Sequence, residues 1–141
     1  MQTDVLYDLL KNELTTSSQF LPHAVMLKLG GYEALSDYTR RKFGEAAGNA
    51  EALATRALML DGIPCRDVKA QLERDLAVEL DVVPRLAAAI RAAVEAGDDA
   101  TRKLLEAILV DAEHHLDWLE AQLHLIAEIG VEAFFAQQTG E

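Results

Sequence analysis

Residues 111–120 read D-A-E-H-H-L-D-W-L-E, and this stretch decides how the chain is expected to fold. Steps of three and four residues back from Leu119 trace one face of a helix, occupied by His115, Ala112, Ile108 and Leu105. His115 therefore shares its face with apolar residues that point toward a core. Because a buried polar group needs a hydrogen-bond partner or a metal, His115 is the first candidate site residue.

The composition favours a single helical domain. The chain has 141 residues, of which 50% are hydrophobic and only 3 are proline. This length suits one domain with its own core, spanning residues 1–141. Alanine, leucine, glutamate and arginine are frequent, and these residues favour helix over sheet. The predicted fold class is therefore all-α.

The charge and the hydropathy pattern argue against several kinds of partner. The formal net charge of −11 leaves no basic stripe for a phosphate backbone, so no nucleic-acid partner is expected. No apolar stretch is long enough to cross a bilayer, and the first residues lack a secretion signal. Cys65 is the single cysteine, which excludes an internal disulfide and fits a reducing compartment. We therefore expect a soluble, cytoplasmic protein with no membrane partner.

Hydrophobic periodicity divides the chain into four long helices and a short tail. The apolar repeats predict helices over about 4–28 and 32–60, a third helix that closes before Gly97, and a fourth over about 100–129. A short fifth helix is predicted for 131–138, which includes Phe134 and Phe135. Long helices joined in this way indicate a four-helix bundle.

Three ionisable side chains fall on the inward faces of these helices, near the middle of each: Glu13, Glu79 and His115. An unpaired carboxylate in an apolar bundle costs several kcal/mol or stays protonated, so a bound metal would explain these residues. Two alternatives remain open. One helix face is rotated from this assignment, or the acids are neutral and hydrogen-bonded to Asn49, Ser17 or His115.

Three segments of the sequence resemble bacterioferritins, the haem-containing branch of the ferritin-like di-iron proteins. They are N-E-L at 12–14, D-L-A-V-E-L-D at 75–81 and the stretch at 111–120. The resemblance implies a ferritin-like bundle in which Glu13, Glu79 and His115 occupy di-iron ligand positions. Bacterioferritins use four glutamates and two histidines as ligands, so the remaining ligand positions can be compared with this sequence.

Half of the family's ligand set is missing. In the register set by the turn at 61–64, the second helix should carry Glu-x-x-His, but this chain has Ala46 and Asn49. In the fourth helix, Ala112 replaces the glutamate that should precede His115 by three residues. The resemblance implies that the glutamates lost at Ala46 and Ala112 are those that bridge the two metals.

Without the bridging carboxylates we expect one divalent metal, iron or zinc, or none. Four carboxylates balance two divalent ions, whereas the remaining two balance only one. By the resemblance, Glu79 and His115 belong to the same metal, Glu13 lies across the bundle, and Asn49 is a weak neutral ligand. Because ferroxidase chemistry needs two neighbouring irons, we assign no catalytic residue and leave open whether the chain is an enzyme.

No haem is expected. In bacterioferritins a methionine of the second helix, one residue after the first glutamate of its ligand motif, binds haem between paired subunits. That position is Ala47 in this chain. Met26 and Met59 lie elsewhere in the sequence, and we interpret them as ordinary core packing.

The connection between the second and third helices is too short for the family's topology. The family uses a long strap that returns along the bundle, and about ten of its residues are missing here. The linker from Asp61 to Asp67 reaches at most about 23 Å, whereas a helix over 32–60 is about 43 Å long. Either Val68 to Arg74 unwinds, which we favour, or the third helix is exchanged with a neighbouring subunit. The shortened strap puts a 24-subunit cage in doubt, although Phe134 and Phe135 offer a means of association.

Three functions compete at this point. The leading hypothesis is a bacterioferritin-like subunit of iron storage and homeostasis with an incomplete ferroxidase centre, either metal-binding or structural. The second is an active ferroxidase that recruits Glu45 or Asp111 in place of the lost bridges. The third is a metal-free helical interaction protein. The expected partner is a second copy, in at least a dimer, or a complete bacterioferritin subunit in a hetero-oligomer.

Overall fold

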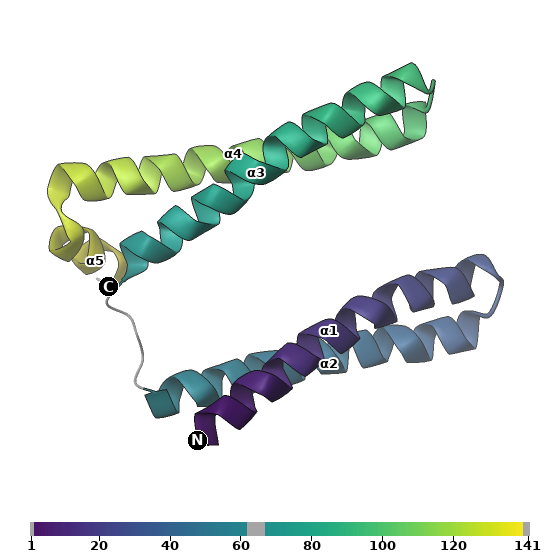
Figure 1. Ribbon diagram of the computed structural model, residues 1–141, viewed down its shortest axis with the longest axis horizontal. Coiled ribbons are helices and arrows are strands. Elements are labelled where there is room, and N and C mark those ends of the chain that lie inside the picture. Colours follow the sequence, from purple (N-terminus) through teal and green to yellow (C-terminus); the bar gives the residue numbers. More distant parts are fainter. Residues whose placement is uncertain (1, 62–66, 140–141) are drawn as a thin grey trace. The chain divides into compact units, whose positions relative to one another are not determined.

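The computed structural model describes residues 2–61 and 67–139, which form five helices (Figure 1). Their bounds are α1 Gln2–Leu29, α2 Glu33–Asp61, α3 Val68–Glu95, α4 Asp99–Ile129 and α5 Val131–Thr139. No strand occurs in the described residues, so the all-α prediction and the short fifth helix are both confirmed. Across these residues, no helix combines the length and the hydropathy that crossing a membrane requires. The helices fall into two compact units, which we call hairpin 1 (α1 and α2) and hairpin 2 (α3, α4 and α5).

Hairpin 1 is closed by a tight turn between α1 and α2. The backbone amide of Tyr32 donates to the carbonyl of Leu27 at 2.9 Å, and that of Gly31 donates to Lys28 at 3.0 Å. This pair of bonds satisfies the last carbonyls of α1, and it requires a residue with positive φ. Gly31 has φ 85°, which a residue without a side chain adopts at little cost. The Gly30-Gly31 pair therefore ends the helix where the sequence predicted.

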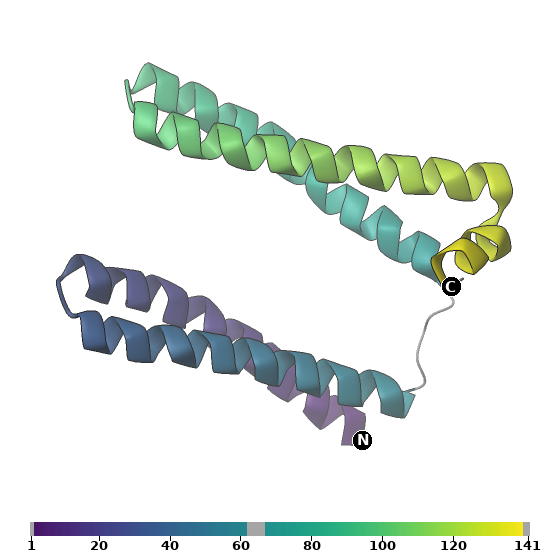
Figure 2. The ribbon, with the colours of Figure 1, turned by 180° about the vertical axis from the view of Figure 1, so that it is seen from behind.

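Small residues let α1 and α2 pack closely, and the two helices lie side by side in both ribbon views (Figures 1 and 2). The buried residues of hairpin 1 are Ser17, Ala24, Ser36, Ala46, Ala50 and Ala57. Ser36 donates its hydroxyl to the carbonyl of Ala24 at 2.7 Å, a buried bond that ties the helices near the turn. At the other end, a hydrogen bond to Asp61 raises the pKa of Tyr7. Both ends of hairpin 1 are thus fixed by polar contacts.

Hairpin 2 turns between α3 and α4 through Gly97, which has φ 69°. Asp98 caps α4 by accepting hydrogen bonds from the amide of Thr101 at 3.0 Å and from its hydroxyl at 2.7 Å. These bonds lower the pKa of Asp98, because they favour the ionised carboxylate. A short loop and the cap on α4 therefore connect α3 and α4 as an antiparallel pair.

The short helix α5 folds back onto its own hairpin. Phe134, only 4% exposed, packs with Leu72, Leu119 and Ile126 in one cluster. Both ribbon views place α5 beside the start of α3 (Figures 1 and 2). The interpretation of Phe134 as a means of subunit association is therefore wrong, because this ring fills the core of hairpin 2.

The start of α3 is helical, so the favoured prediction that Val68 to Arg74 unwinds is also wrong. Two local features explain the difference. The side chain of Asp67 caps the helix by accepting from the amide of Ala70 at 3.1 Å. One turn later, Leu72 enters the apolar cluster with Phe134, so unwinding this turn would expose buried surface. Residues 62–66, which form most of the shortened crossover, lie outside the described residues.

Candidate metal site

Glu79 of α3 and His115 of α4 meet across hairpin 2. Nδ1 of His115 lies 2.9 Å from Oε1 of Glu79. The side chain of Glu79 is 18% exposed and that of His115 is 48% exposed. Helix periodicity places Glu79 on the same face as Leu72, Leu76 and Val83, and this face packs against α4. The contact therefore joins a half-buried acid to an imidazole at the edge of the helix pair.

The contact joins a carboxylate oxygen and an imidazole nitrogen, and both of these atoms are common metal ligands. In a tetrahedral zinc site the nitrogen and oxygen ligands each lie about 2.0–2.2 Å from the metal, which separates them by roughly 3.4 Å. A separation of 2.9 Å is close to that value. A small opening of the pair would therefore admit one divalent ion between the two atoms, so these donors fit a metal.

His115 lies farther from the core of hairpin 2 than the sequence predicted. Ala112 and Leu119 are buried, at 8% and 0% exposure, as expected for the inward face of α4. His115 and Ile108 are exposed within hairpin 2, because both lie on one flank of that face and α3 covers the other. The expectation that all of these residues point equally into the core is wrong for hairpin 2 taken by itself.

Trp118 is the aromatic neighbour of His115. Their ring centroids lie 6.3 Å apart with an interplanar angle of 26°. The indole is therefore stacked against the imidazole, at a separation typical of aromatic pairs. Sequence reasoning did not single out this residue, although its spacing of three from His115 places both on one side of α4.

In hairpin 1, Glu13 of α1 and Asn49 of α2 line the same hollow. Its other lining residues are Leu6, Leu9, Ala52, Leu53 and Arg56. Glu13 is half-buried and Asn49 is exposed within the hairpin. Ala46, one turn before Asn49, is 4% exposed and has no donor atom in its side chain. The structure thus brings two of the predicted ligand positions together on hairpin 1, one turn of α2 away from Ala46, where the resemblance implies a third.

A second hollow places a lysine next to the same two residues. Glu13 and Asn49 line it together with Lys42 and Glu45. The ammonium of Lys42 lies 3.0 Å from a carboxylate oxygen of Glu45, and this bond raises the pKa of Lys42. Lys42 therefore stays cationic beside Glu13. Sequence reasoning missed this residue, although the spacing of Lys42, Ala46 and Asn49 places all three on one face of α2.

The acids considered as replacements for the bridging ligands that the resemblance implies are exposed. Glu45 is paired with Lys42, while Asp111 and Glu113 flank Ala112 at exposed positions. A step of one residue turns a side chain by about 100° around a helix, which accounts for their positions. Over the residues that the structure describes, no group of three or more His, Cys, Asp or Glu side chains comes together to hold a metal ion.

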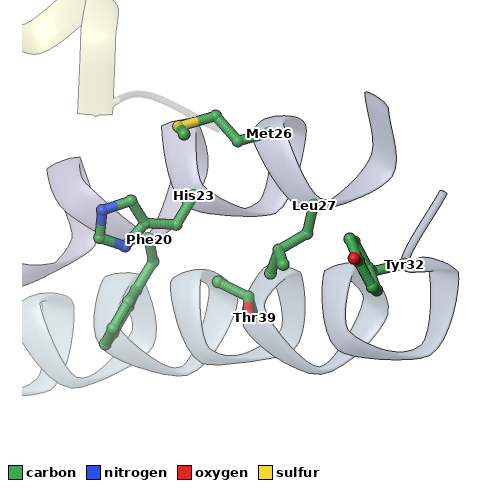
Figure 3. Close-up of a pocket in the computed structure, with 6 residues that line it drawn as sticks. All are labelled: Phe20, His23, Met26, Leu27, Tyr32 and Thr39. Atoms are coloured by element: carbon green, nitrogen blue, oxygen red, sulfur yellow. The ribbon is translucent and has the colours of Figure 1, made fainter. Parts of the chain in front are cut away.

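A third hollow of hairpin 1 lies near the turn and is mainly apolar (Figure 3). It is lined by Phe20, His23, Met26, Leu27, Tyr32 and Thr39. Phe20 and Leu27 extend from α1 toward α2, whereas Met26 projects away from α2 (Figure 3). Met26 is 68% exposed and Met59 is 60% exposed, so neither is packed in the core of hairpin 1. Their interpretation as core residues is wrong for this hairpin, because both lie off the α1–α2 contact face.

Comparison with known proteins places this chain in a family. The sequence model of the ferritin-like domain matches residues 3–129. The chain is 36% identical to the bacterioferritin of Mycolicibacterium paratuberculosis, over 94% of this chain and 90% of that protein. It is 33% identical to the bacterioferritin of Streptomyces coelicolor, over 94% of this chain and 86% of that protein. The chain belongs to the bacterioferritin family.

A third relative also supports membership of this family. A bacterial ferritin of Pseudomonas aeruginosa is 34% identical over 96% of this chain and 94% of its own length. Bacterioferritins are iron-storage proteins with the ferritin-like fold, so the chain is a member of an iron-storage family. The resemblance drawn from the segments at 12–14, 75–81 and 111–120 is therefore confirmed. Within this bacterioferritin-family chain, Glu79 and His115 are the predicted ligands in direct contact.

Proposed function

We propose that this bacterioferritin-family chain is an iron-handling subunit whose own ferroxidase centre is incomplete, and that it holds one divalent metal. Glu79 and His115 are the main ligands, and Glu13 and, more weakly, Asn49 are the further ligand positions that the family resemblance implies. The observation that carries the proposal is the 2.9 Å contact between Glu79 and His115, next to a buried alanine at position 112. A carboxylate and an imidazole remain as donors where one bridging ligand has been lost.

The charge of the donor set supports one metal and not two. Glu13 and Glu79 together supply two negative charges, which neutralise a single divalent ion. Ala46 and Ala112 are buried and add no charge to the site. Lys42 adds a positive charge beside Glu13, which further disfavours a second cation. Iron or zinc fits a set of two carboxylates and one imidazole.

Slow iron oxidation follows from a single metal. Rapid ferroxidase chemistry takes one electron from each of two neighbouring irons, so a one-metal site lacks the second donor. The proposed role is therefore to bind metal, or to build an assembly, and not to oxidise iron at a high rate. In the cytoplasm the chain would act as a homo-oligomer of at least two copies, or with a complete bacterioferritin subunit.

Metal titration tests this function. We expect the metal-free protein to bind one Zn²⁺ or Co²⁺ per chain by calorimetry, and Glu79→Gln to weaken binding by about tenfold or more. The matched control is Glu73→Gln, because Glu73 lies on the same helix but is exposed and paired with Lys69. Oxygen uptake with Fe²⁺ should stay slow. Rapid consumption at two irons per chain would contradict the proposal.

A metal-free interaction protein is the second candidate. It is favoured by the hydrogen bond from His115, which satisfies the half-buried carboxylate of Glu79 without any metal. The same titration separates the two functions. Stoichiometric uptake that Glu79→Gln removes excludes the metal-free protein, whereas no uptake by the wild type supports it.

A further inference from the structure

An imidazole and a thioether are neighbours on α1. His23 and Met26 are three residues apart, so they share one side of the helix, with Cβ atoms about 5–6 Å from each other. Helical side chains lean toward the N-terminal end of their helix, so the thioether of Met26 extends over the turn that carries His23. The side chain of Met26 follows this direction (Figure 3). The two groups therefore lie within reach of each other.

Neither side chain takes part in the contact between α1 and α2. Ala24 is fully buried at 0% exposure and Leu27 extends toward α2, so these two residues make that contact (Figure 3). Met26 is 68% exposed, and His23 is also exposed within hairpin 1. In the part of the chain that the structure describes, no hydrogen bond, ion pair or ring contact engages either side chain. Their donor atoms are therefore free to bind a ligand.

The surroundings of this pair favour an ion of low charge. The hollow that both residues line is completed by Phe20, Leu27, Tyr32 and Thr39. None of these lining residues is an acid. A divalent ion would therefore keep its full charge against mainly apolar walls, which is unfavourable. A monovalent ion carries half of that charge and needs no carboxylate to neutralise it.

The donor atoms also favour a soft ion. Methionine sulfur selects Cu⁺, and imidazole is a good ligand of copper, whereas Mg²⁺ and Ca²⁺ prefer oxygen. Bonds of about 2.3 Å to sulfur and 2.0 Å to imidazole, as in zinc sites, would place two opposite ligands roughly 4.3 Å apart. Met26 has three rotatable side-chain bonds, so it can adjust to this separation from His23.

We propose that His23 and Met26 form a binding site for one soft monovalent metal ion, Cu⁺, on hairpin 1. One nitrogen of the imidazole and the sulfur of Met26 each donate a lone pair to the ion, and no electron is transferred. The inference goes beyond the proposed function, because Glu79 and His115 offer a carboxylate to a divalent ion whereas this pair is neutral. The two sites lie on different hairpins and share no residue.

Competition for Cu⁺ tests the site. Cys65 is the single thiol of the chain and would bind Cu⁺ by itself, so the parent protein and every variant carry Cys65→Ser. Each protein is titrated with Cu⁺ in the absence of oxygen, with bicinchoninate as a coloured competitor. We expect one Cu⁺ per chain in the parent. Met26→Leu and His23→Ala should each weaken binding by about tenfold or more, because losing a residue that only orients a ligand already costs this much.

Matched controls come from the same chain. Met59→Leu removes a methionine of similar exposure, 60% against 68% for Met26. His124→Ala removes an exposed histidine of α4, which lies 3.8 Å from Glu128. Both controls should keep the affinity of the parent. Equal loss of affinity in Met26→Leu and Met59→Leu would overturn the proposal, and so would a parent protein that binds no stoichiometric Cu⁺.

Magnetic resonance locates the ion independently of its affinity. Ag⁺ is a diamagnetic substitute for Cu⁺ that is stable in air. With ¹³C-methyl-labelled methionine, the methyl signal of Met26 should shift as Ag⁺ is added, while that of Met59 stays in place. Met26→Leu assigns the signal and replaces methionine with a residue of similar size, so the fold is kept. A shift of Met59 in place of Met26 would show that the ion binds elsewhere and refute the site.

Comparison of Cu⁺ with Zn²⁺ separates this site from the one on hairpin 2. Glu79→Gln should lose affinity for Zn²⁺ and keep that for Cu⁺, whereas Met26→Leu should do the reverse. If Glu79→Gln abolishes the binding of Cu⁺, the ion binds at Glu79 and His115 and the inference fails. Binding of Cu⁺ that depends on Met26, in a protein that takes up no Zn²⁺, would support the inference and remove the proposed function.

Discussion

His115 and Glu79 are 36 residues apart in the sequence, yet Nδ1 of the imidazole lies 2.9 Å from a carboxylate oxygen. The turn through Gly97 sets this register, because each residue lies 16 positions from the end of its helix at the turn. A half-buried acid is thereby satisfied without a metal, but by a partner that is itself a good metal ligand. The same contact thus stabilises the metal-free hairpin and holds two potential metal ligands close together.

Trp118 should report metal binding at His115. It is the single tryptophan of the chain, and its ring centroid lies 6.3 Å from that of His115. We expect Co²⁺ to quench the fluorescence of Trp118 in a saturable way, because a paramagnetic ion on the imidazole lies next to the indole. His115→Ala should abolish the saturable phase, while His124→Ala, on an exposed part of α4, should leave it unchanged. Equal quenching in both variants would contradict a site at His115.

Lys42 should lower the affinity of the site for cations. It lines a hollow with Glu13 and Asn49, and its ammonium stays charged through the bond to Glu45. Removing one positive charge near a divalent ion should raise the affinity by roughly three- to tenfold, depending on screening. We expect Lys42→Gln to bind Zn²⁺ more tightly by this factor in calorimetry. Its control is Lys11→Gln, an exposed position on α1, where no change is expected.

Phe134 should contribute strongly to the stability of the protein. Its ring is 4% exposed and fills a cluster with Leu72, Leu119 and Ile126. Phe134→Ala should lower the free energy of unfolding by about 3–5 kcal/mol, because it removes buried apolar surface and leaves a cavity. Denaturant unfolding followed by circular dichroism measures the change. Phe135→Ala, at a half-buried position on the same helix, should cost clearly less.

The helices could be predicted from the sequence because the residue patterns that begin, continue and end a helix are local. The Gly30-Gly31 pair, Gly97 and Gly130 all stand at helix ends. The apolar spacing predicted the bounds of α1, α2 and α4 and the end of α3 to within a few residues. The same periodicity assigned the inward faces of α3 and α4 in hairpin 2. Glu79 and Ala112 lie on the faces that the spacing assigned to them.

The errors arose where tertiary contacts outweigh local signals. Val68 to Arg74 was expected to unwind because only linker length was considered, but Leu72 and the Asp67 cap hold this segment helical. Phe134 was interpreted as an association residue because an exposed tail and a tail folded onto its own hairpin have the same sequence pattern. Likewise, Lys42 was missed because a single lysine on a helix face carries no signal until its neighbours on α1 are known.

Restoring the lost ligands should convert the chain into a ferroxidase. Ala46→Glu, Asn49→His and Ala112→Glu together supply the two bridging carboxylates and the second imidazole that the family's di-iron ligand positions require. Positions 46 and 112 are 4% and 8% exposed, so each new carboxylate should destabilise the metal-free protein by several kcal/mol. Binding of Fe²⁺ should recover this stability, because a ligand that binds only the folded state stabilises it.

Oxygen uptake then measures the gain in function. The restored variant should oxidise two irons per chain in a rapid phase that the wild type lacks, and its melting temperature should rise steeply with added Zn²⁺. The matched control has its acids one residue away from these positions. It carries Ala47→Glu in place of Ala46→Glu, and it relies on the natural Glu113 in place of Ala112→Glu. An acid on the flank of the helix cannot bridge two metals. If the restored variant folds, binds two metals and still shows no rapid phase, the missing bridges are not what limits oxidation in this chain.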